Sequence, residues 1–466
     1  MIILIVGAGI AGLSLAIALG QAGHAVTLLD AAPSLAEIGA GIQMTPQAIK
    51  YLFALGLRDD ILRASIAPRQ MLIRDGLTGG VLGAVDVAAM EDSYGAPYVV
   101  VHRAVLHAIL HRHAVRAGAD ILLDSTVARY DFAEGAVELT SGKTLTADLV
   151  VAADGINSTA RAQLLGKDAD PGSQPTGWAA FRMAAEVAKL QADPLTADIV
   201  DLRSGSSNFW IAPDVSVMTY LVKEATMLNL VLSHHDDIDT RNLSLEEHRA
   251  IVNDLFKTFE PRVQRMFELS RPSITNYPVY AVPPLPRWTH PSGRFVLLGD
   301  AAHAMAFYMS MGVSLAVEDA VALAAALESV DLPQRRTEQR SKPPEAQQQA
   351  PPPQQEALQR ALGAFETVRK QRVAAVQEAS LHGGNSLHVP SGEERDFLYE
   401  SLSHSHEDGI WPVKEDGVQS PFVKYGSSGD RLGPGGITDR GTRDWCYGYD
   451  AVAEVITALK STKGQN

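Results

Sequence analysis

The sequence predicts an α/β fold, in which a Rossmann-like nucleotide-binding domain carries an inserted, mostly antiparallel β-sheet and is followed by a C-terminal helical region. Three features of the chain indicate this arrangement. At residues 2–19 and 294–327, an apolar run of strand length ends in a glycine-containing turn and passes into a helix rich in Ala and Leu. Between these stretches, residues 177–282 consist mainly of β-type runs. After them, residues 331–357 are rich in Pro and Gln and show no apolar periodicity.

The amino-terminal stretch has the layout of a dinucleotide site. Residues 2–6 read as a buried parallel strand, and Gly7, Gly9 and Gly12 follow it with G-x-G-x-x-G spacing at the start of a helix. A second strand ends at Asp30, whose carboxylate can bind the ribose of an adenosine while the pyrophosphate lies at the first helix N-terminus. Because Asp rather than Arg stands there, NADP is disfavoured at this site, and FAD and NAD both remain open.

The stretch around Asp300 is a second candidate site. Residues 294–298 form an apolar run of strand length, so Asp300 lies at the carboxyl end of a predicted strand, where open α/β sheets bind ligands. A helical pattern begins near Gly312 and Val313, and its N-terminus would direct N–H groups and partial positive charge at that strand end. An electron-rich ring would be stabilised there. Taken alone, residues 299–303 fit a plain strand-to-helix turn equally well.

Three further segments are candidate ligand contacts. A glycine-rich loop containing Ala40 and Gly41 precedes a predicted helix. Arg103 is the last residue of a predicted strand and could bind a phosphate or a flavin, or form a surface ion pair. Asp154 follows another strand, in an acidic turn that also contains Gly155. A structural turn is the alternative interpretation of the loop that contains Ala40 and Gly41.

The same patterns divide the chain into five sections. The predicted strand before Asp300 has the same pattern as the N-terminal part, an apolar run followed by a glycine-containing turn. We therefore interpret the sheet between the two parts as an insertion. The segment rich in Pro and Gln would bury little, so we expect it to be disordered. A helical pattern follows at about 356–380, and the tail reads as an irregular cover. The expected sections are residues 1–175 and 286–330 for the nucleotide-binding domain, 176–285 for a substrate domain, 331–357 for the disordered insertion, and 358–466 for the C-terminal helix and cover.

Composition excludes several classes of protein. The formal net charge of −14 argues against a nucleic-acid or anionic-membrane binder, which would need a basic face. The single cysteine, Cys446, rules out an internal disulfide and a cysteine-rich metal site, and it fits a reducing compartment. The first apolar run is too short for a signal core, and no window approaches a membrane span. We therefore expect a cytoplasmic protein.

Together these motifs resemble the FAD-dependent aromatic hydroxylases, the single-component flavoprotein monooxygenases of the salicylate hydroxylase type. Residues 7–12 with Asp30 are similar to that family's FAD-ADP site, Asp154 with Arg161 to its second motif, and residues 299–319 to its ribityl motif. Arg103 and the segments 37–43 and 387–390 also resemble the salicylate hydroxylase branch. The resemblance covers most of residues 1–420.

The resemblance implies a monooxygenase of secondary metabolism that uses NAD(P)H and O₂ to hydroxylate an aromatic or phenolic small molecule through a flavin hydroperoxide, as a monomer or homodimer. Arg182 and Tyr220 resemble the Arg and Tyr of related phenol hydroxylases, where a cation lowers a phenol pKa and a tyrosine relays its proton. The implied cofactor contacts are Gly7, Gly9, Gly12, Asp30, Ala40, Gly41, Arg103, Asp154, Asp300, Gly312 and Val313.

The chain also departs from the family pattern. Ala304, Phe307 and Met311 stand where the family often has Pro, Pro and Gln, which alters the pocket beside the flavin ring, so salicylate does not carry over as the substrate. Two other classes stay open. Another FAD-dependent oxidoreductase, such as an oxidase, epoxidase or reductase, would share the first motif. A non-catalytic dinucleotide-binding protein would keep the motifs but need no closed pocket.

Overall fold

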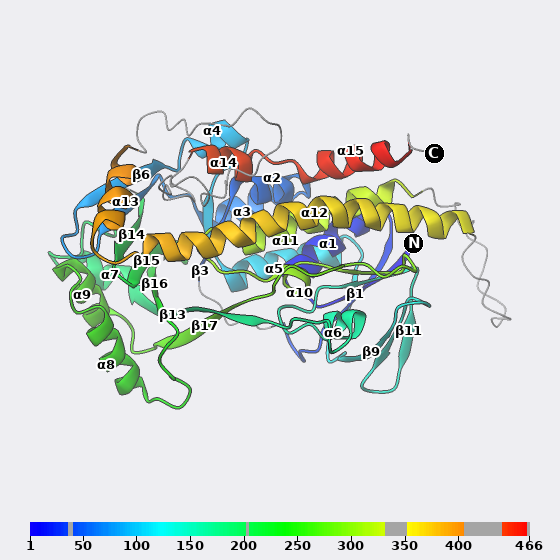
Figure 1. The fold of residues 1–466 in the computed structure, drawn as a ribbon, viewed down its shortest axis with the longest axis horizontal. Coiled ribbons are helices and arrows are strands. Elements are labelled where there is room, and N and C mark those ends of the chain that lie inside the picture. Colours follow the sequence, from blue (N-terminus) through cyan, green and yellow to red (C-terminus); the bar gives the residue numbers. More distant parts are fainter. Residues whose placement is uncertain (36–40, 202–204, 331–351, 405–439, 464–466) are drawn as a thin grey trace.

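The computed structural model describes residues 1–35, 41–201, 205–330, 352–404 and 440–463 of the chain. Ala40, one of the expected cofactor contacts, lies outside these residues, as does the segment 331–351. The described parts form a mixed α/β fold with two main sheets and a group of C-terminal helices (Figure 1). This is the fold class that the sequence predicted.

A parallel five-stranded sheet forms the core of the nucleotide-binding part. Its strand order is β18-β12-β1-β2-β8, and every neighbouring pair is parallel. Since β1, β12 and β18 are neighbours, the three motifs that follow them meet at one edge of the sheet. The strands are β1 (Ile2–Val6), β2 (Ala25–Leu29), β8 (Asp120–Leu122), β12 (Leu149–Ala152) and β18 (Phe295–Leu297).

Helices pack on this sheet and start at its carboxyl edge. Helix α1 (Ile10–Gln21) contacts both α5 (Arg103–Arg116) and α11 (Gly312–Glu328). Residues are buried nearly all around α1 and α11. This explains why their sequences are apolar on nearly every side, since only a helix enclosed by protein tolerates that pattern. The exceptions in α11 include Glu318 and Asp319, which are buried with cationic partners.

A seven-stranded sheet forms the second layer, with the order β17-β13-β16-β15-β14-β5-β6. Only β14 and β5 pair in parallel, so the sheet is mostly antiparallel, as expected. However, β5 and β6 come from the section expected to belong to the nucleotide-binding domain, so the expected border at residue 176 does not coincide with the sheet. The strands are β5 (Gln70–Asp75), β6 (Val81–Asp86), β13 (Gln174–Glu186), β14 (Ser206–Ala212), β15 (Val215–Val222), β16 (Met227–His235) and β17 (Thr275–Ala281).

Two small sheets and several short helices complete the first 330 residues. In one of them β10 and β11 pair antiparallel and form a hairpin that turns at residues 141–142. The small sheets contain β9 (Val127–Asp131), β10 (Ala136–Leu139), β11 (Thr144–Thr146), β3 (Gly41–Met44), β4 (Ser65–Ile66) and β7 (Val99–His102). The helices are α2 (Pro46–Ala54), α3 (Arg58–Ala64), α4 (Met90–Tyr94), α6 (Thr159–Leu165), α7 (Val187–Gln191), α8 (Leu245–Leu255), α9 (Pro261–Leu269) and α10 (Asp300–His303).

The C-terminal region is more helical than the sequence indicated. Helix α12 (Pro352–Leu387) runs along the long axis of the molecule, from the parallel sheet to the seven-stranded sheet (Figure 1). It begins inside the segment expected to be disordered and ends beyond residue 380. Most of the described part of the expected irregular cover is also helical, in α13 (Glu393–His404), α14 (Arg440–Tyr447) and α15 (Ala451–Lys463). Such short helices are stabilised by tertiary packing more than by propensity, which explains their weak sequence signal. No helix in the described ranges is both long and apolar enough to cross a bilayer.

Candidate active site

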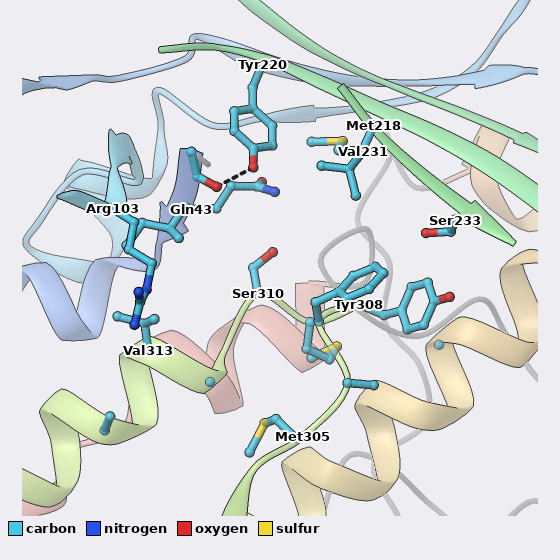
Figure 2. Close-up of a pocket in the computed structure, with 18 of the residues that line it drawn as sticks. Gln43, Arg103, Met218, Tyr220, Val231, Ser233, Met305, Tyr308, Ser310 and Val313 are labelled. Atoms are coloured by element: carbon cyan, nitrogen blue, oxygen red, sulfur yellow. Dashed lines mark hydrogen bonds between the residues drawn. The ribbon is translucent and has the colours of Figure 1, made fainter. Parts of the chain in front are cut away.

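A pocket of about 390 Å³ lies between the carboxyl edge of the parallel sheet and one face of the seven-stranded sheet. Figure 2 shows side chains from both layers facing each other across it. Eight of the residues expected from the sequence line it: Gly9, Gly41, Arg103, Arg182, Tyr220, Asp300, Gly312 and Val313. The tertiary structure therefore brings these eight residues to one cavity, whereas Gly7, Gly12, Asp30 and Asp154 are not among the residues that line it.

The three glycines of the first motif have different roles. A Cβ atom on Gly7, where φ is +108°, would lie 2.2 Å from the Ala153 oxygen, and one on Gly12 would lie 2.0 Å from the Gly7 oxygen. These two glycines therefore allow the loop to pack on β12 and on itself. By contrast, a Cβ atom on Gly9 would meet no protein atom within 4 Å. Gly9 thus borders open space in the pocket, which is where a pyrophosphate needs close backbone approach.

The peptide groups of Ala8 are held from two sides. The Ala8 N–H donates to Asp30 Oδ2 at 2.7 Å, and the Ala8 carbonyl accepts from His107 Nε2 at 2.7 Å. The other Asp30 oxygen accepts from the Ala32 N–H at 2.8 Å. Asp30 therefore positions the glycine loop, and its contact with a ribose stays a prediction. His107 was missed from the sequence, although it lies one helical turn after Arg103 and so shares its helix face.

The N-termini of two helices open into the pocket. Gly9 precedes α1 and Met311 precedes α11, and neither residue makes a side-chain capping bond. Neither helix has an acidic residue in its first turn. The partial positive charge at these ends is therefore not neutralised by the helices themselves, which suits a pyrophosphate at α1 and an electron-rich ring at α11.

Asp300 lies at the start of α10, at the floor of the pocket. Its side chain is exposed to the pocket, but the surrounding protein still desolvates the carboxylate. This desolvation raises the pKa of Asp300, and the nearby charges of His303 and Arg103 offset part of the rise. A carboxylate in this position can accept hydrogen bonds from ligand hydroxyl groups, as the ribityl role requires.

A buried charge cluster holds the turn that carries Asp300. Asp319 Oδ2 accepts from the Gly299 N–H at 3.1 Å and from His303 Nε2 at 2.6 Å, and Asp319 Oδ1 accepts from Arg369 Nε at 2.7 Å. Burial raises the pKa of Asp319, but His303 and Arg369 outweigh it and the net pKa is lowered. Removing one member of such a buried set costs about 3–5 kcal/mol, because its partner stays buried without compensation.

Arg372 extends this cluster to the C-terminal helices. It donates to both carboxylate oxygens of Glu318 at 2.9 Å and to the carbonyl oxygen of Cys446 at 2.7 Å. Its guanidinium also lies 3.8 Å from the ring centroid of Tyr449. The sequence interpretation missed Arg369 and Arg372, although two cations three residues apart on the apolar face of a predicted helix could have signalled buried acidic partners.

Asp154 and Arg161 stabilise the second motif. Asp154 Oδ2 accepts from the backbone N–H groups of Thr159 and Ala160, at 3.0 and 3.2 Å. Gly155 lines the pocket, whereas Asp154 does not. Arg161 is buried and donates to Asp170 at 2.9 Å and to the carbonyl oxygen of Ala301 at 3.3 Å. Arg161 therefore ties the second motif to the turn that carries Asp300, and the expected contact of Asp154 with the cofactor stays a prediction.

The two expected catalytic residues are neighbours. Burial raises the pKa of the Tyr220 hydroxyl, and the charge of Arg182 lowers it in part. The Tyr220 hydroxyl donates to the Gly41 carbonyl at 2.7 Å (Figure 2). The hydroxyl proton of Tyr220 is therefore donated to Gly41, although it is the proton that Tyr220 would transfer in the expected proton relay. The Arg182 guanidinium lies 5.6 Å from the ring centroid of Phe307. Arg182 belongs to β13, whereas Phe307 belongs to the loop between α10 and α11.

The departures from the family pattern have unequal effects on the pocket. Phe307 lines the pocket, in the loop that leads into α11. Ala304 and Met311 are buried and are not among the lining residues. The sulfur of Met311 accepts a hydrogen bond from Gln47 at 3.4 Å. Of the three departures, Phe307 is therefore the one that shapes the pocket directly.

The pocket residues fit FAD, and comparisons with known proteins agree. The family model described as "FAD binding domain" matches residues 1–332. The chain is 30% identical to the FAD-dependent monooxygenase OpS4 of Beauveria bassiana over 469 residues, covering 99% of this chain and 98% of that protein. It is 32% identical to 3-hydroxybenzoate 6-hydroxylase 1 of Aquipseudomonas alcaligenes over 326 residues, covering 69% and 79%.

Solved structures show the same fold. A salicylate hydroxylase substrate complex aligns with a TM-score of 0.71 at 21% identity, over 98% of both chains. Klebsiella pneumoniae HpxO, complexed with FAD and uric acid, aligns with a TM-score of 0.70 at 23% identity, over 87% of this chain and 93% of that one. The non-catalytic alternative is set aside, because the relatives are monooxygenases and hydroxylases. The chain belongs to the FAD-dependent aromatic hydroxylase family and is an FAD-dependent monooxygenase.

Proposed function

We propose that this monooxygenase takes electrons from NAD(P)H and uses O₂ to hydroxylate an aromatic or phenolic small molecule bound beside Arg182. The observation that carries the proposal is the position of Arg182, which reaches from β13 into a mainly apolar pocket that also contains Asp300 and the start of α11. When bound, FAD would accept a hydride from NAD(P)H and deliver one oxygen atom of O₂ to the substrate.

Residues on the parallel-sheet side would hold the cofactor. Gly9 leaves room for the pyrophosphate, and Asp300 can accept hydrogen bonds from the ribityl hydroxyls. Gly312 and Val313 present the N-terminal N–H groups of α11, where negative charge on a reduced ring is stabilised. Arg103 adds a cation on the same side of the pocket.

Arg182 would act on the substrate from the opposite side. A guanidinium near a phenol stabilises the phenolate, lowers the phenol pKa and makes the ring more electron-rich. Tyr220 would hold Arg182 in place, because its oxygen can still accept a hydrogen bond while its proton is donated to Gly41. We therefore assign Tyr220 a positioning role in place of the expected proton relay.

Apolar side chains would keep water away from the reacting atoms. Met305, Phe307 and Met309 line the pocket from the loop between α10 and α11, and Leu387 lines it from the end of α12. Excluding water strengthens the attraction between Arg182 and a phenolate, and it suppresses hydrolytic side reactions.

The test is to purify the protein, identify the released cofactor, and screen phenols and aromatic acids for stimulation of NADH and NADPH oxidation under isotopically labelled O₂. We expect a hydroxylated product that carries one labelled oxygen atom. Stimulated oxidation that yields only hydrogen peroxide with every compound would favour an oxidase instead.

The cytoplasmic location and the monomeric or dimeric state also stay predictions. Light scattering checks the oligomeric state.

A further inference from the structure

A row of side chains crosses the sheet wall of the pocket. The strand register aligns, in order from β13 to β5, Arg182, Val231, Met218, Phe209 and Ile73. All of them line the pocket, and we call them the wall row. Residues in register on neighbouring strands direct their side chains to the same face of a sheet. The wall row is therefore one continuous surface.

The wall row is long compared with a single aromatic ring. Neighbouring strands lie about 4.8 Å apart, and four such spacings separate β13 from β5, so the row extends for roughly 19 Å. A benzene ring with short substituents, bound at Arg182, covers only the beginning of this length. The remainder provides binding surface that such a ring cannot reach.

The chemical character of the wall row changes along its length. Arg182 is charged, whereas Val231, Met218, Phe209 and Ile73 are apolar. Met218 and Phe209 are only half buried although they face the interior, so each keeps apolar surface directed at the pocket. In Figure 2, Met218 and Val231 lie on the sheet side and Met305 on the opposite side. The pocket is thus a slot with apolar surfaces on both sides.

The cofactor residues lie on the other side of this slot. Asp300 begins α10, and Gly312 and Val313 begin α11. Figure 2 shows Val313 on its helix, across the pocket from Met218 and Val231. A ring held by α11 therefore leaves the wall row to face the substrate.

We propose that the substrate is an extended, largely apolar aromatic compound, whose hydroxyl-bearing ring lies at Arg182 and whose apolar part follows the wall row towards Ile73. This inference rests on the proposed function, because it takes Arg182 as the partner of the substrate hydroxyl. It adds that a single-ring hydroxybenzoate fills only one end of the site.

A series of 4-alkylphenols tests the inference directly. Binding of phenol and of its 4-methyl, 4-propyl, 4-pentyl and 4-heptyl derivatives to the FAD-loaded enzyme is measured from the change in flavin absorbance, which requires no turnover. We expect the dissociation constant to fall roughly threefold to fourfold per added methylene group, the factor that burial of a methylene in an apolar site gives. An affinity that stays flat or falls beyond the methyl derivative would overturn the inference.

Two substitutions locate the site along the wall row. Met218→Trp fills the middle of the row and Ile73→Trp its far end, so the gain in affinity should stop at a shorter chain in the first variant than in the second. Leu72→Trp is the matched control, since Leu72 is on the same strand as Ile73 but points to the opposite face of the sheet. The control should keep the full dependence on chain length. If all three variants behave alike, the wall row is not the binding surface.

Flavin content, measured on each variant, separates a blocked slot from a misfolded protein. If Ile73→Trp loses FAD, Ile73→Ala replaces it. Ile73→Ala should weaken binding of the heptyl compound more than binding of the methyl compound.

Product analysis separates this inference from the proposed function. Tight binding of long alkylphenols without any oxygenated product would contradict only the function. Hydroxylation of phenols with no dependence on chain length would contradict only the inference.

Discussion

The hydroxyl of Tyr220 donates a 2.7 Å hydrogen bond to the carbonyl oxygen of Gly41, and this bond joins the seven-stranded sheet to the strand that follows the glycine-rich loop. The contact is close, because a Cβ atom on Gly41 would lie 2.5 Å from the Tyr220 ring. The seven-stranded sheet and the strand that carries Gly41 are therefore in direct contact at the pocket through these two residues.

Replacing either partner should have a distinct effect. Tyr220→Phe leaves a buried carbonyl oxygen without its donor, so we expect a loss of about 1–3 kcal/mol in unfolding free energy, with FAD retained. Gly41→Ala forces the ring to move, and we expect a loss of similar size together with weaker FAD binding. Chemical denaturation and flavin titration check both. If Tyr220→Phe changes neither stability nor turnover, the bond has no positioning role.

Gly9 and Gly12 should separate cofactor binding from folding. Gly9→Val places a side chain in space that no protein atom occupies, so the protein should fold but bind FAD at least tenfold more weakly. Gly12→Val collides with the Gly7 carbonyl and should lower stability itself, by several kcal/mol. The melting temperature of the FAD-free protein is the measurement. Equal loss of stability in the two variants would refute this division.

Substitutions of Asp300 and Arg182 should have different effects, the first on FAD binding and the second on the reaction of the substrate. Asp300→Ala should lower FAD occupancy and with it every activity. Arg182→Ala should keep FAD but lose substrate-stimulated turnover by roughly two to four powers of ten, the range found when a positioned charge or proton-transfer partner is removed. Arg182→Lys, which keeps the charge, should retain more turnover than Arg182→Ala. Flavin loss in Arg182→Ala, or full turnover on the true substrate, would show the assignment to be wrong.

His388 should make the folded state sensitive to acid. Burial lowers its pKa to about 4, while Nδ1 donates to the Gly384 carbonyl and Nε2 accepts from the Ser216 hydroxyl at 2.8 Å. Between about pH 6.5 and pH 4, the unfolded chain binds a proton at His388 that the folded chain does not. The stability from this group is therefore fully present above pH 6.5 and is lost as the pH falls to 4, by about 3 kcal/mol.

The measurement is the unfolding free energy between pH 4 and pH 7 for the native protein and for His388→Gln. Because other groups titrate in the same range, the difference between the two slopes isolates His388. The native protein should show the steeper loss of stability on acidification. Parallel curves would mean that His388 does not remain neutral in the folded state at these pH values.

The local patterns of the sequence determined the elements of the nucleotide-binding part and identified several of the residues that line the pocket. Residues close together in the chain set the apolar runs of strand length, the glycine spacing and the apolar pattern of the buried helices. These features could therefore be predicted from the sequence. Gly9, Asp300, Gly312 and Arg182 are expected residues that line the observed pocket.

The tertiary structure alone decided how distant segments meet. Strands β5 and β6 join the substrate sheet, His107 holds the Ala8 carbonyl, and Arg369 binds Asp319, yet none of these partners is close to the other in sequence. The wall row likewise depends on the register of five strands. A one-residue slip in the register of any of these strands would turn its wall-row side chain to the opposite face of the sheet. The alternation of apolar and polar residues within one strand does not specify which strand pairs with it.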